Sequence, residues 1–263
     1  MNDALPINQI ICGDNVETLQ TFPDDCIDLV VTSPPYDALR TYGGHSWDFD
    51  GVAAELWRVI KPGGVVVWVV ADATIDGSET GTSFRQALRF MDIGFRLHDT
   101  MIWEKKTFSL PFPNRYHQVW EFMFVFAKGE PTFNPIEDRK NIHGGTTVSV
   151  TVREQNGELT RRSDKTVKEN GKRFNVWKVA DAKHNEYGDH PAPFPESLAR
   201  DHILSWSNEG DIVLDPFGGS GTTAKMAKHN GRKYIGIEIN QEYCEIANNR
   251  LSQGVFEFAE VVQ

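Results

Sequence analysis

The sequence predicts an α/β fold, in which one mostly parallel β-sheet is covered by helices on both faces. The first observation is that apolar segments typical of buried strands alternate with helical segments along most of the chain. The second is the length of 263 residues, which suits one large domain with a small insertion. The third is the composition, which is 40% hydrophobic and 24% charged, as in an ordinary globular protein.

The first half of the chain carries the longer run of this alternation. The turns Phe22-Pro23-Asp24 and Lys61-Pro62-Gly63-Gly64 separate its segments, because proline and glycine interrupt regular structure. The aromatic residues near Trp103 and Trp120 are expected to pack in the core. We expect strands at residues 9–12, 27–32, 64–70, 98–103 and 119–127, and helices at residues 15–20, 50–59 and 82–92.

The regular pattern fades between about Lys128 and His190, where glycine, asparagine and charged residues increase. A structureless loop of that length is unusual inside a compact domain, so we expect an insertion with some structure of its own at residues 129–189. Beyond the insertion the alternation resumes. We expect helices at residues 195–205, 221–229 and 241–250, and strands at residues 211–215 and 233–238.

The charge is unevenly distributed along the chain. The formal net charge is −10, which argues against a nucleic-acid partner. Residues 151–185, however, carry nine Lys and Arg against five acids, a local excess of four positive charges. This basic segment is either a surface that faces a polyanion or a solvated loop of mixed charge.

Neither a membrane segment nor a metal site is expected. No apolar run approaches 18 residues, and the N-terminal segment lacks the pattern of a signal peptide, so we expect a cytoplasmic protein. Cys12, Cys26 and Cys244 are too few and too scattered for a disulfide framework or a zinc site. We expect them to be small buried packing residues.

The strand at residues 27–32 runs into Thr32-Ser33-Pro34-Pro35-Tyr36. Two adjacent prolines stiffen the loop and remove two backbone N–H donors, so hydrogen-bond acceptors dominate what remains. Ser33 and the carbonyl of Pro34 are acceptors, and Tyr36 offers a flat face for stacking. This combination suits a planar group that carries an amine. The alternative is a plain turn that leaves an edge strand.

The second chemical signal is a glycine-rich turn after the strand that ends at Asp215. Gly218, Gly219 and Gly221 permit positive φ angles and a close approach of the backbone to a ligand. Glu238 ends the next strand, where a carboxylate can accept hydrogen bonds from ribose hydroxyls. The pattern indicates a nucleoside-binding βαβ unit. It also fits the looser dinucleotide motif, so a nicotinamide oxidoreductase remains an alternative at this point.

Together the two loops resemble those of the S-adenosylmethionine-dependent DNA amino-methyltransferases, which methylate cytosine N4 or adenine N6. The residues 215–221, DPFGGSG, are similar to the cofactor loop of that family, and residues 32–36, TSPPY, to its catalytic loop. The likeness extends to residues 11–14, to residues 56–64 and to His190-Pro191, and so covers nearly the whole chain. It implies a Rossmann-like methyltransferase fold with a seven-stranded sheet and S-adenosylmethionine as the cofactor.

The resemblance assigns roles to particular residues. Ser33, Pro34, Pro35 and Tyr36 are the implied catalytic residues. The implied cofactor-binding residues are Asp14, Asp215, Pro216, Phe217, Gly218, Gly219, Ser220, Gly221, Thr222, Glu238 and Ile239. The segment HPAPFP at residues 190–195 departs from the commoner Thr-x-Lys-Pro pattern of the family, which leaves its contacts with the cofactor open.

The order of the motifs is that of the family's circularly permuted beta arrangement, because the catalytic loop precedes the cofactor loop. In that arrangement the intervening region, here residues 129–189, recognises the DNA target. Residues 211–215, 233–238, 9–12 and 27–32 then become the first to fourth strands of the methyltransferase sheet. The implied DNA contacts are Arg40, in a candidate lid at residues 39–44, with Arg115, Arg161, Arg162, Lys172 and Arg173.

The implied mechanism starts from an exocyclic amine, whose lone pair is delocalised into the ring. Hydrogen bonds to Ser33 Oγ and to the Pro34 carbonyl would localise that lone pair on a base flipped out of double-stranded DNA and stacked on Tyr36. Family members with Ser at this position mostly methylate cytosine N4, and a hydroxyl can also donate toward cytosine N3. We therefore favour cytosine N4, with adenine N6 as the alternative.

Other interpretations remain open at this stage. A related methyltransferase could act on RNA or on a protein amide, a nicotinamide oxidoreductase would leave the residues 33–36 without a task, and a DNA-binding module could have lost catalysis. The resemblance also allows a homodimer and a cognate restriction endonuclease as partners, in a bacterium, an archaeon or a phage.

Overall fold

The computed structural model describes residues 5–36, 47–107, 113–149, 151–161, 164–180 and 195–252. The chain divides into two compact units. The larger unit contains Met1–Asn134 and Asn175–Gln263, and the smaller unit contains Pro135–Phe174. Each unit is described separately below.

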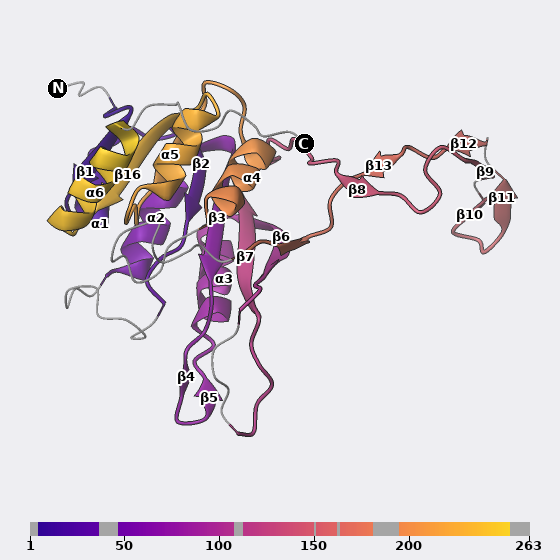
Figure 1. Ribbon diagram of the computed structural model, residues 1–263, viewed down its shortest axis with the longest axis horizontal. Helices are drawn as coiled ribbons and strands as arrows, with labels where there is room; N and C mark the ends of the chain where they lie inside the picture. Colours follow the sequence, from indigo (N-terminus) through magenta and orange to yellow (C-terminus); the bar gives the residue numbers. More distant parts are fainter. Residues whose placement is uncertain are drawn as a thin grey trace, which may run out of the picture. The chain divides into compact units, whose positions relative to one another are not determined.

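The larger unit is built on an eight-stranded sheet with the strand order β1-β16-β15-β2-β3-β7-β6-β14 (Figure 1). Strand β7 runs antiparallel to both of its neighbours, and the other neighbouring pairs are parallel. The strands are β1 (Gln9–Cys12), β2 (Ile27–Thr32), β3 (Ile60–Val70), β6 (Arg96–Glu104), β7 (Trp120–Ala127), β14 (Val176–Lys178), β15 (Ile212–Asp215) and β16 (Lys233–Glu238).

Helices cover both faces of this sheet (Figure 1). One layer is the contacting series α1 (Asn15–Gln20), α2 (Phe49–Val59) and α3 (Thr82–Ile93), and the other is α4 (Glu196–Trp206), α5 (Thr222–His229) and α6 (Gln241–Ser252). Fully buried side chains such as Trp68, Phe90 and Phe126 fill the core between helices and sheet. The predicted α/β fold is therefore confirmed. Among the described residues, no helix is both long and apolar enough to cross a membrane.

Most predicted elements lie within two or three residues of the observed ones, and the differences have local causes. The sheet has eight strands rather than seven, because β14, inside the predicted insertion, pairs with β6. The predicted turn at residues 61–64 is a bulge within β3, since Ile60 still pairs with Ile27 and Val65 with Leu29. Cys26 and Cys244 are buried as predicted, whereas the prediction was wrong for Cys12, which is exposed at the end of β1.

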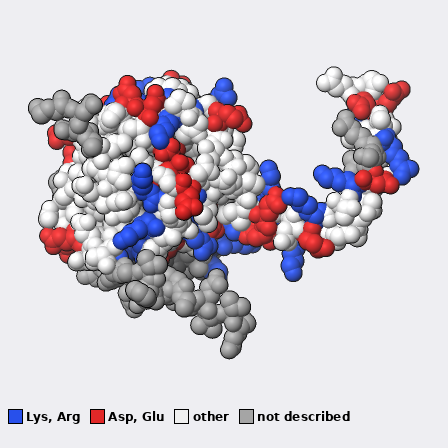
Figure 2. Space-filling view, turned by 90° about the horizontal axis from the view of Figure 1, so that it is seen from above, with Lys and Arg blue, Asp and Glu red and all other residues white. Residues whose placement is uncertain are grey.

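The smaller unit is one long, irregular β-hairpin. Three short antiparallel ladders lie one inside the next and close at residues 154–158: β8 (Arg139–Lys140) with β13 (Asn170–Gly171), β9 (Thr147–Val148) with β12 (Lys165–Thr166), and β10 (Thr151–Arg153) with β11 (Leu159–Arg161). The insertion thus has structure of its own, as expected. Acidic and basic side chains lie side by side along this unit, at the right of Figure 2.

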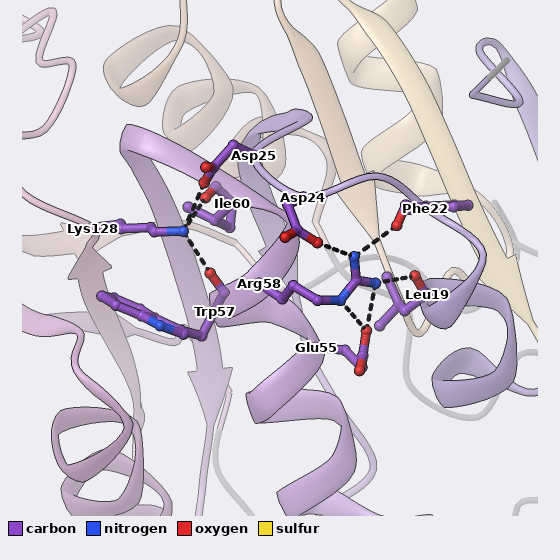
Figure 3. Close-up of polar contacts among 9 residues, drawn as sticks. All are labelled: Leu19, Phe22, Asp24, Asp25, Glu55, Trp57, Arg58, Ile60 and Lys128. Carbon is purple, nitrogen blue, oxygen red and sulfur yellow. Dashed lines mark hydrogen bonds and ion pairs between the residues drawn. The ribbon is translucent and has the colours of Figure 1, made fainter. Parts of the chain in front are cut away.

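Two cations anchor the chain where it enters β2 (Figure 3). Arg58 donates hydrogen bonds to the carbonyl oxygens of Leu19 and Phe22, each at 2.7 Å, and pairs with Asp24 and Glu55. Lys128 donates to Asp25 Oδ1 at 2.7 Å and to two further carbonyl oxygens. These contacts fix the start of the strand whose carboxyl end leads into the residues 33–36.

Candidate active site

The two predicted loops lie at neighbouring strand ends. Strands β15 and β2 pair in parallel, so Asp215 and Thr32 end at the same edge of the sheet. Thr32 Oγ1 donates a hydrogen bond to Asp215 Oδ1 at 2.7 Å, although the two residues are 183 positions apart in the sequence. Thr223 Oγ1 adds a hydrogen bond to the carbonyl oxygen of Val31 at 3.1 Å. The structure therefore connects the glycine-rich loop directly to the strand that carries Ser33.

The glycine-rich loop needs its glycines for conformation and for space. Gly219 and Gly221 have φ angles of 49° and 78°, in the left-handed region that favours glycine. A Cβ atom on Gly221 would lie 2.9 Å from Cβ of Ala247 in α6, closer than such atoms pack. A Cβ atom on Gly218 would lie 3.3 Å from the carbonyl oxygen of Ile237. The loop thus turns tightly between the sheet and α6.

Glu238 holds this loop through both of its carboxylate oxygens. The backbone N–H of Gly219 donates to Oε2 and that of Asn240 to Oε1, each at 2.8 Å. Each oxygen keeps a second lone pair, so the fixed carboxylate can still accept hydrogen bonds from two hydroxyl groups. Asp14 follows the neighbouring strand β1 and caps α1 by accepting from the N–H of Glu17. Ile239 is 42% exposed beside Glu238 and offers an apolar surface.

Asp215 is a buried acid with a structural task in this geometry. Burial raises the pKa of its carboxyl group to about 6, against hydrogen bonds that lower the pKa, the largest from Thr32. Its Oδ1 atom also accepts a hydrogen bond from the backbone N–H of Phe217 at 3.1 Å. The carboxyl group therefore joins the end of β2 to the first residues of the glycine-rich loop.

Further contacts fix the loop from behind, and sequence reasoning missed the residues that make them. Arg250 in α6 donates to the backbone oxygen and to Oγ of Ser220, and to Oγ1 of Thr222. Its other terminal nitrogen lies 2.8 Å from Glu196 Oε1, which Lys225 also contacts. Asn15, Phe217 and Pro216 complete the frame: Asn15 donates to the Pro216 carbonyl oxygen, and Phe217 packs against Trp47 and Trp68.

A chain of polar contacts holds the Ser-Pro-Pro-Tyr loop. Ser33 Oγ and the Tyr36 hydroxyl lie 2.9 Å apart, and that hydroxyl donates to Glu121 Oε2 at 2.8 Å. Glu121 Oε1 forms an ion pair with Lys105, which follows β6. Glu121 is buried in β7, within the apolar run WEFMFVFA. Sequence reasoning missed Glu121, and the signal that could have revealed it is a single acid in an otherwise apolar strand. Within this loop Pro34 is buried and Pro35 is half-buried.

The geometry fits the comparison with protein families. A family model described as DNA methylase, of the N6 and N4 type, matches residues 27–249. This chain belongs to that DNA methylase family. The family prediction made from the two loops is therefore confirmed.

Relatives of this DNA methylase support the same assignment. The orphan methyltransferase M.BamHII of Bacillus amyloliquefaciens is 58% identical over 237 residues, which are 86% of this chain and 89% of that protein. The DNA adenine methyltransferase YhdJ of Escherichia coli K12 is 29% identical over 262 residues, 92% of this chain and 82% of that protein.

A solved structure extends the comparison to the cofactor. The DNA modification methylase TTHA0409 of Thermus thermophilus, complexed with S-adenosyl-L-methionine, is 27% identical to this chain. The two superpose with a TM-score of 0.64 over 95% of this chain and 97% of that one. The cofactor predicted from the sequence is thus the one bound in this structural neighbour.

The residues proposed to contact DNA in this methylase lie in several places. Arg115 donates to the Gly77 carbonyl oxygen and to Glu79, and so joins its loop to the hairpin of β4 (Thr74–Ile75) and β5 (Ser78–Glu79). Arg40 with the candidate lid, Arg162 and residues 190–194 lie outside the described residues.

The remaining DNA candidates lie in the smaller unit. Arg161 donates to Ser149 Oγ at 2.7 Å and pairs with Asp164. Arg173 pairs with Asp138, and its hydrogen bond holds the pKa of the Asp138 carboxyl group below its usual value. The backbone oxygen of Lys172 accepts a hydrogen bond from Arg139. Two of the predicted arginines are therefore already engaged with acids of the same unit.

Proposed function

We propose that this DNA methylase transfers the methyl group of S-adenosylmethionine to the exocyclic amine of a flipped base in double-stranded DNA, at cytosine N4. The observation that carries the proposal is the hydrogen bond between Thr32 and Asp215, which joins the loop of Ser33 to the nucleoside-binding loop. The serine at the first position of the Ser-Pro-Pro-Tyr loop supports cytosine. The name of the relative YhdJ, a DNA adenine methyltransferase, supports adenine N6 as the second candidate.

The residues around the glycine-rich loop fit the cofactor. Glu238 presents a carboxylate with two lone pairs to spare, which suits the paired hydroxyls of a ribose. The exposed Ile239 would contact the adenine ring, and Asp14 would accept from the adenine amine. The glycines of residues 218–221 would let the backbone approach the methionine portion. When bound, the cofactor supplies an electrophilic methyl group on a sulfonium centre.

The catalytic loop prepares the amine of the base. Ser33 Oγ and the Pro34 carbonyl oxygen would accept hydrogen bonds from its N–H groups, and so would localise the nitrogen lone pair for an in-line attack. Tyr36 would stack on the flipped base, and Pro35 would stiffen the loop. Burial raises the pKa of Cys26 to about 11 and that of Cys244 to about 12. Neither thiol supplies a thiolate at neutral pH, and transfer to an amine requires none.

We propose that residues 129–189, and within them the hairpin Pro135–Phe174, recognise the DNA target. The support is the positive excess of the basic segment and the division of the chain into two units. Arg40, Arg115, Arg161, Arg162, Lys172 and Arg173 are the proposed contacts. Because Arg161 and Arg173 are paired with acids, they would have to exchange those partners for phosphate oxygens.

The assembly state and setting are also proposals. A homodimer, a cognate restriction endonuclease and a cytoplasmic location follow from the family resemblance. The relative M.BamHII is described as an orphan methyltransferase, and that wording favours action without a paired endonuclease. Light scattering of the purified protein measures the oligomeric state.

The test of this function is a methylation assay. The purified protein is incubated with labelled S-adenosylmethionine and mixed-sequence duplex DNA, and the digested nucleosides are analysed by mass spectrometry. We expect N4-methylcytosine. N6-methyladenine would keep the methyltransferase activity but overturn the assignment of the base, and the absence of label from DNA would overturn the function.

The variant Ser33→Ala is the matched control for the catalytic loop. Removing one acceptor of the amine should lower turnover by roughly 100-fold, the usual size for the loss of one stabilising contact in a transition state. Cofactor affinity, measured by calorimetry, should stay within about twofold of wild type, since Ser33 is not among the cofactor residues. Wild-type turnover in this variant would remove Ser33 from the mechanism.

A further inference from the structure

The catalytic hydroxyl of Ser33 is the first member of a hydrogen-bonded series that ends at a buried ion pair. The series runs from Ser33 through the Tyr36 hydroxyl to Glu121 and Lys105. We propose that Glu121 is a positioning residue that fixes the direction of the Ser33 hydroxyl, so that Ser33 acts toward the target base only as an acceptor. This inference rests on the amine methylation proposed above.

Counting protons along the series gives this direction. Lys105 has only donors, and it occupies Glu121 Oε1. The carboxylate offers its other oxygen, Oε2, as an acceptor, and the single proton of the Tyr36 hydroxyl is donated to it at 2.8 Å. The Tyr36 oxygen can then only accept from Ser33, at 2.9 Å. The Ser33 proton is therefore used, and the lone pairs of its oxygen are left for the base.

A fixed hydroxyl selects among bases in a way that a rotating one does not. An exocyclic amine, as in cytosine or adenine, presents N–H groups that Ser33 can accept. The carbonyl oxygens of thymine and guanine at the corresponding positions would face an acceptor with an acceptor, which leaves both unpaired. The same direction removes a donation from Ser33 to cytosine N3. The preference for cytosine N4 then depends on the identity of the serine rather than on such a donation.

Neither stacking nor packing explains these groups. A phenylalanine ring at position 36 would stack on a base as well as tyrosine does, so stacking does not require the hydroxyl. Glu121 has a side chain only 8% exposed in an apolar strand, and burying a charge there is costly unless its partners compensate. Both oxygens of Glu121 have a partner, and the Oε2 partner is the hydroxyl next to Ser33.

The decisive variant is Glu121→Gln, because it should reverse the series. Lys105 can only donate, so it should take the amide oxygen, and the amide NH2 group should face Tyr36. Tyr36 would then accept from Gln and donate to Ser33, and the Ser33 proton would point at the N–H groups of the base. We expect kcat to fall by about 100-fold in Glu121→Gln. In Tyr36→Phe, where the Ser33 hydroxyl is merely released, we expect a fall of about 10-fold, the size of one lost hydrogen bond.

The test is the double variant Glu121→Gln with Tyr36→Phe. Removing the Tyr36 hydroxyl should interrupt the reversed series, so the double variant should be about tenfold faster than Glu121→Gln alone. A purely structural role of Glu121 predicts the opposite, since two separate defects add. The Michaelis constant for DNA and the calorimetric cofactor affinity should stay within about twofold, and thermal melting should show that each variant is folded.

A matched control comes from the neighbouring strand. Glu104→Gln removes an acid of β6 that pairs with Lys178, and it should leave kcat unchanged. A double variant as slow as, or slower than, Glu121→Gln alone would overturn the inference while leaving the methylation of DNA amines intact. A wild-type protein that methylates no amine in DNA would overturn the proposed function and, with it, this inference.

Discussion

At the scale of single residues, the site depends on a buried acid that is not aimed at a ligand. Asp215 accepts hydrogen bonds from Thr32 and from the N–H of Phe217. Burial raises the pKa of this carboxyl group to about 6, because the charged form loses its water. The folded protein therefore bears the cost of an ionised Asp215 at neutral pH, in exchange for the connection between the two loops.

The variant Asp215→Asn should show this cost. Its amide oxygen can accept the same two hydrogen bonds, but it carries no charge. Because the folded pKa lies above the usual 3.8, the cost is fully present above about pH 6 and is relieved as the pH falls toward 4. We expect Asp215→Asn to be more stable than wild type at pH 8 by on the order of 2 kcal/mol, or several degrees in Tm. Melting curves at pH 8 and pH 5 measure it, and an advantage that does not shrink at pH 5 would contradict this account.

Single residues were also where the sequence was most informative. The left-handed φ angles of Gly219 and Gly221 and the carboxylate of Glu238 follow from local chemistry, and so local motifs indicate them. The pairing of Tyr36 with Glu121 does not, because it joins residues 85 positions apart that only the folded sheet brings together. The sequence alone showed that Tyr36 was present, but not which group its hydroxyl contacts.

At the scale of elements, helix α6 acts as a brace for the cofactor loop. Arg250 reaches from its last turn to Ser220, Thr222 and Glu196, and only 12% of its side chain is exposed. Such a brace restricts the loop before a ligand arrives, and so reduces the ordering cost of binding.

Replacing this brace should weaken cofactor binding. Arg250→Met keeps an apolar stem and removes the hydrogen bonds to the loop, so we expect the dissociation constant for S-adenosylmethionine to rise by about tenfold, or 1.4 kcal/mol. The matched control is Arg58→Met, which removes an arginine with as many polar partners at the start of β2 (Figure 3). That control should lower Tm and leave calorimetric affinity unchanged. Equal losses of affinity in the two variants would mean that general destabilisation, not the brace, is responsible.

The elements show why part of the fold escaped prediction. The strands and helices of the larger unit have strong apolar patterns, and their bounds were predicted closely. The ladders β8 to β13 have only two or three residues per strand and mostly exposed, polar side chains, so no alternation marks them. Strand β14 escaped for the same reason: it is three residues long, and only Trp177 is buried.

At the scale of the whole molecule, the division into two units separates two tasks that can be tested separately. We expect that residues 141–169 can be removed and Lys140 joined to Asn170 by an Asn-Gly turn, since these two residues face each other in the β8–β13 ladder. This shortened protein should bind S-adenosylmethionine with wild-type affinity and lose at least about tenfold in DNA affinity. Calorimetry and fluorescence anisotropy measure the two affinities, and unchanged DNA binding would exclude the hairpin from recognition.

The charges of the hairpin give a finer test. Among the described residues, no acid pairs with Arg153 or Lys165, whereas Arg173 pairs with Asp138. Unpaired cations release counterions from DNA most readily, so Arg153→Gln with Lys165→Gln should reduce the slope of log affinity against log salt by about 2. Arg173→Gln, the comparison variant, should change the slope less. Equal effects per charge would show that the ion pair opens fully on DNA.

The order of strands in the sheet also has a consequence for biosynthesis. Strand β1 is made first but pairs only with β16, and β2 receives β15 on one side only after residue 215 has been made. During synthesis, the apolar side chains of β1 and β2 must therefore wait for the last quarter of the chain. Such delayed, long-range pairing slows folding and leaves strand edges open to aggregation. A ribosome-bound fragment that ends before β15 would depend on chaperones, and the cofactor could stabilise the protein only once synthesis is nearly complete.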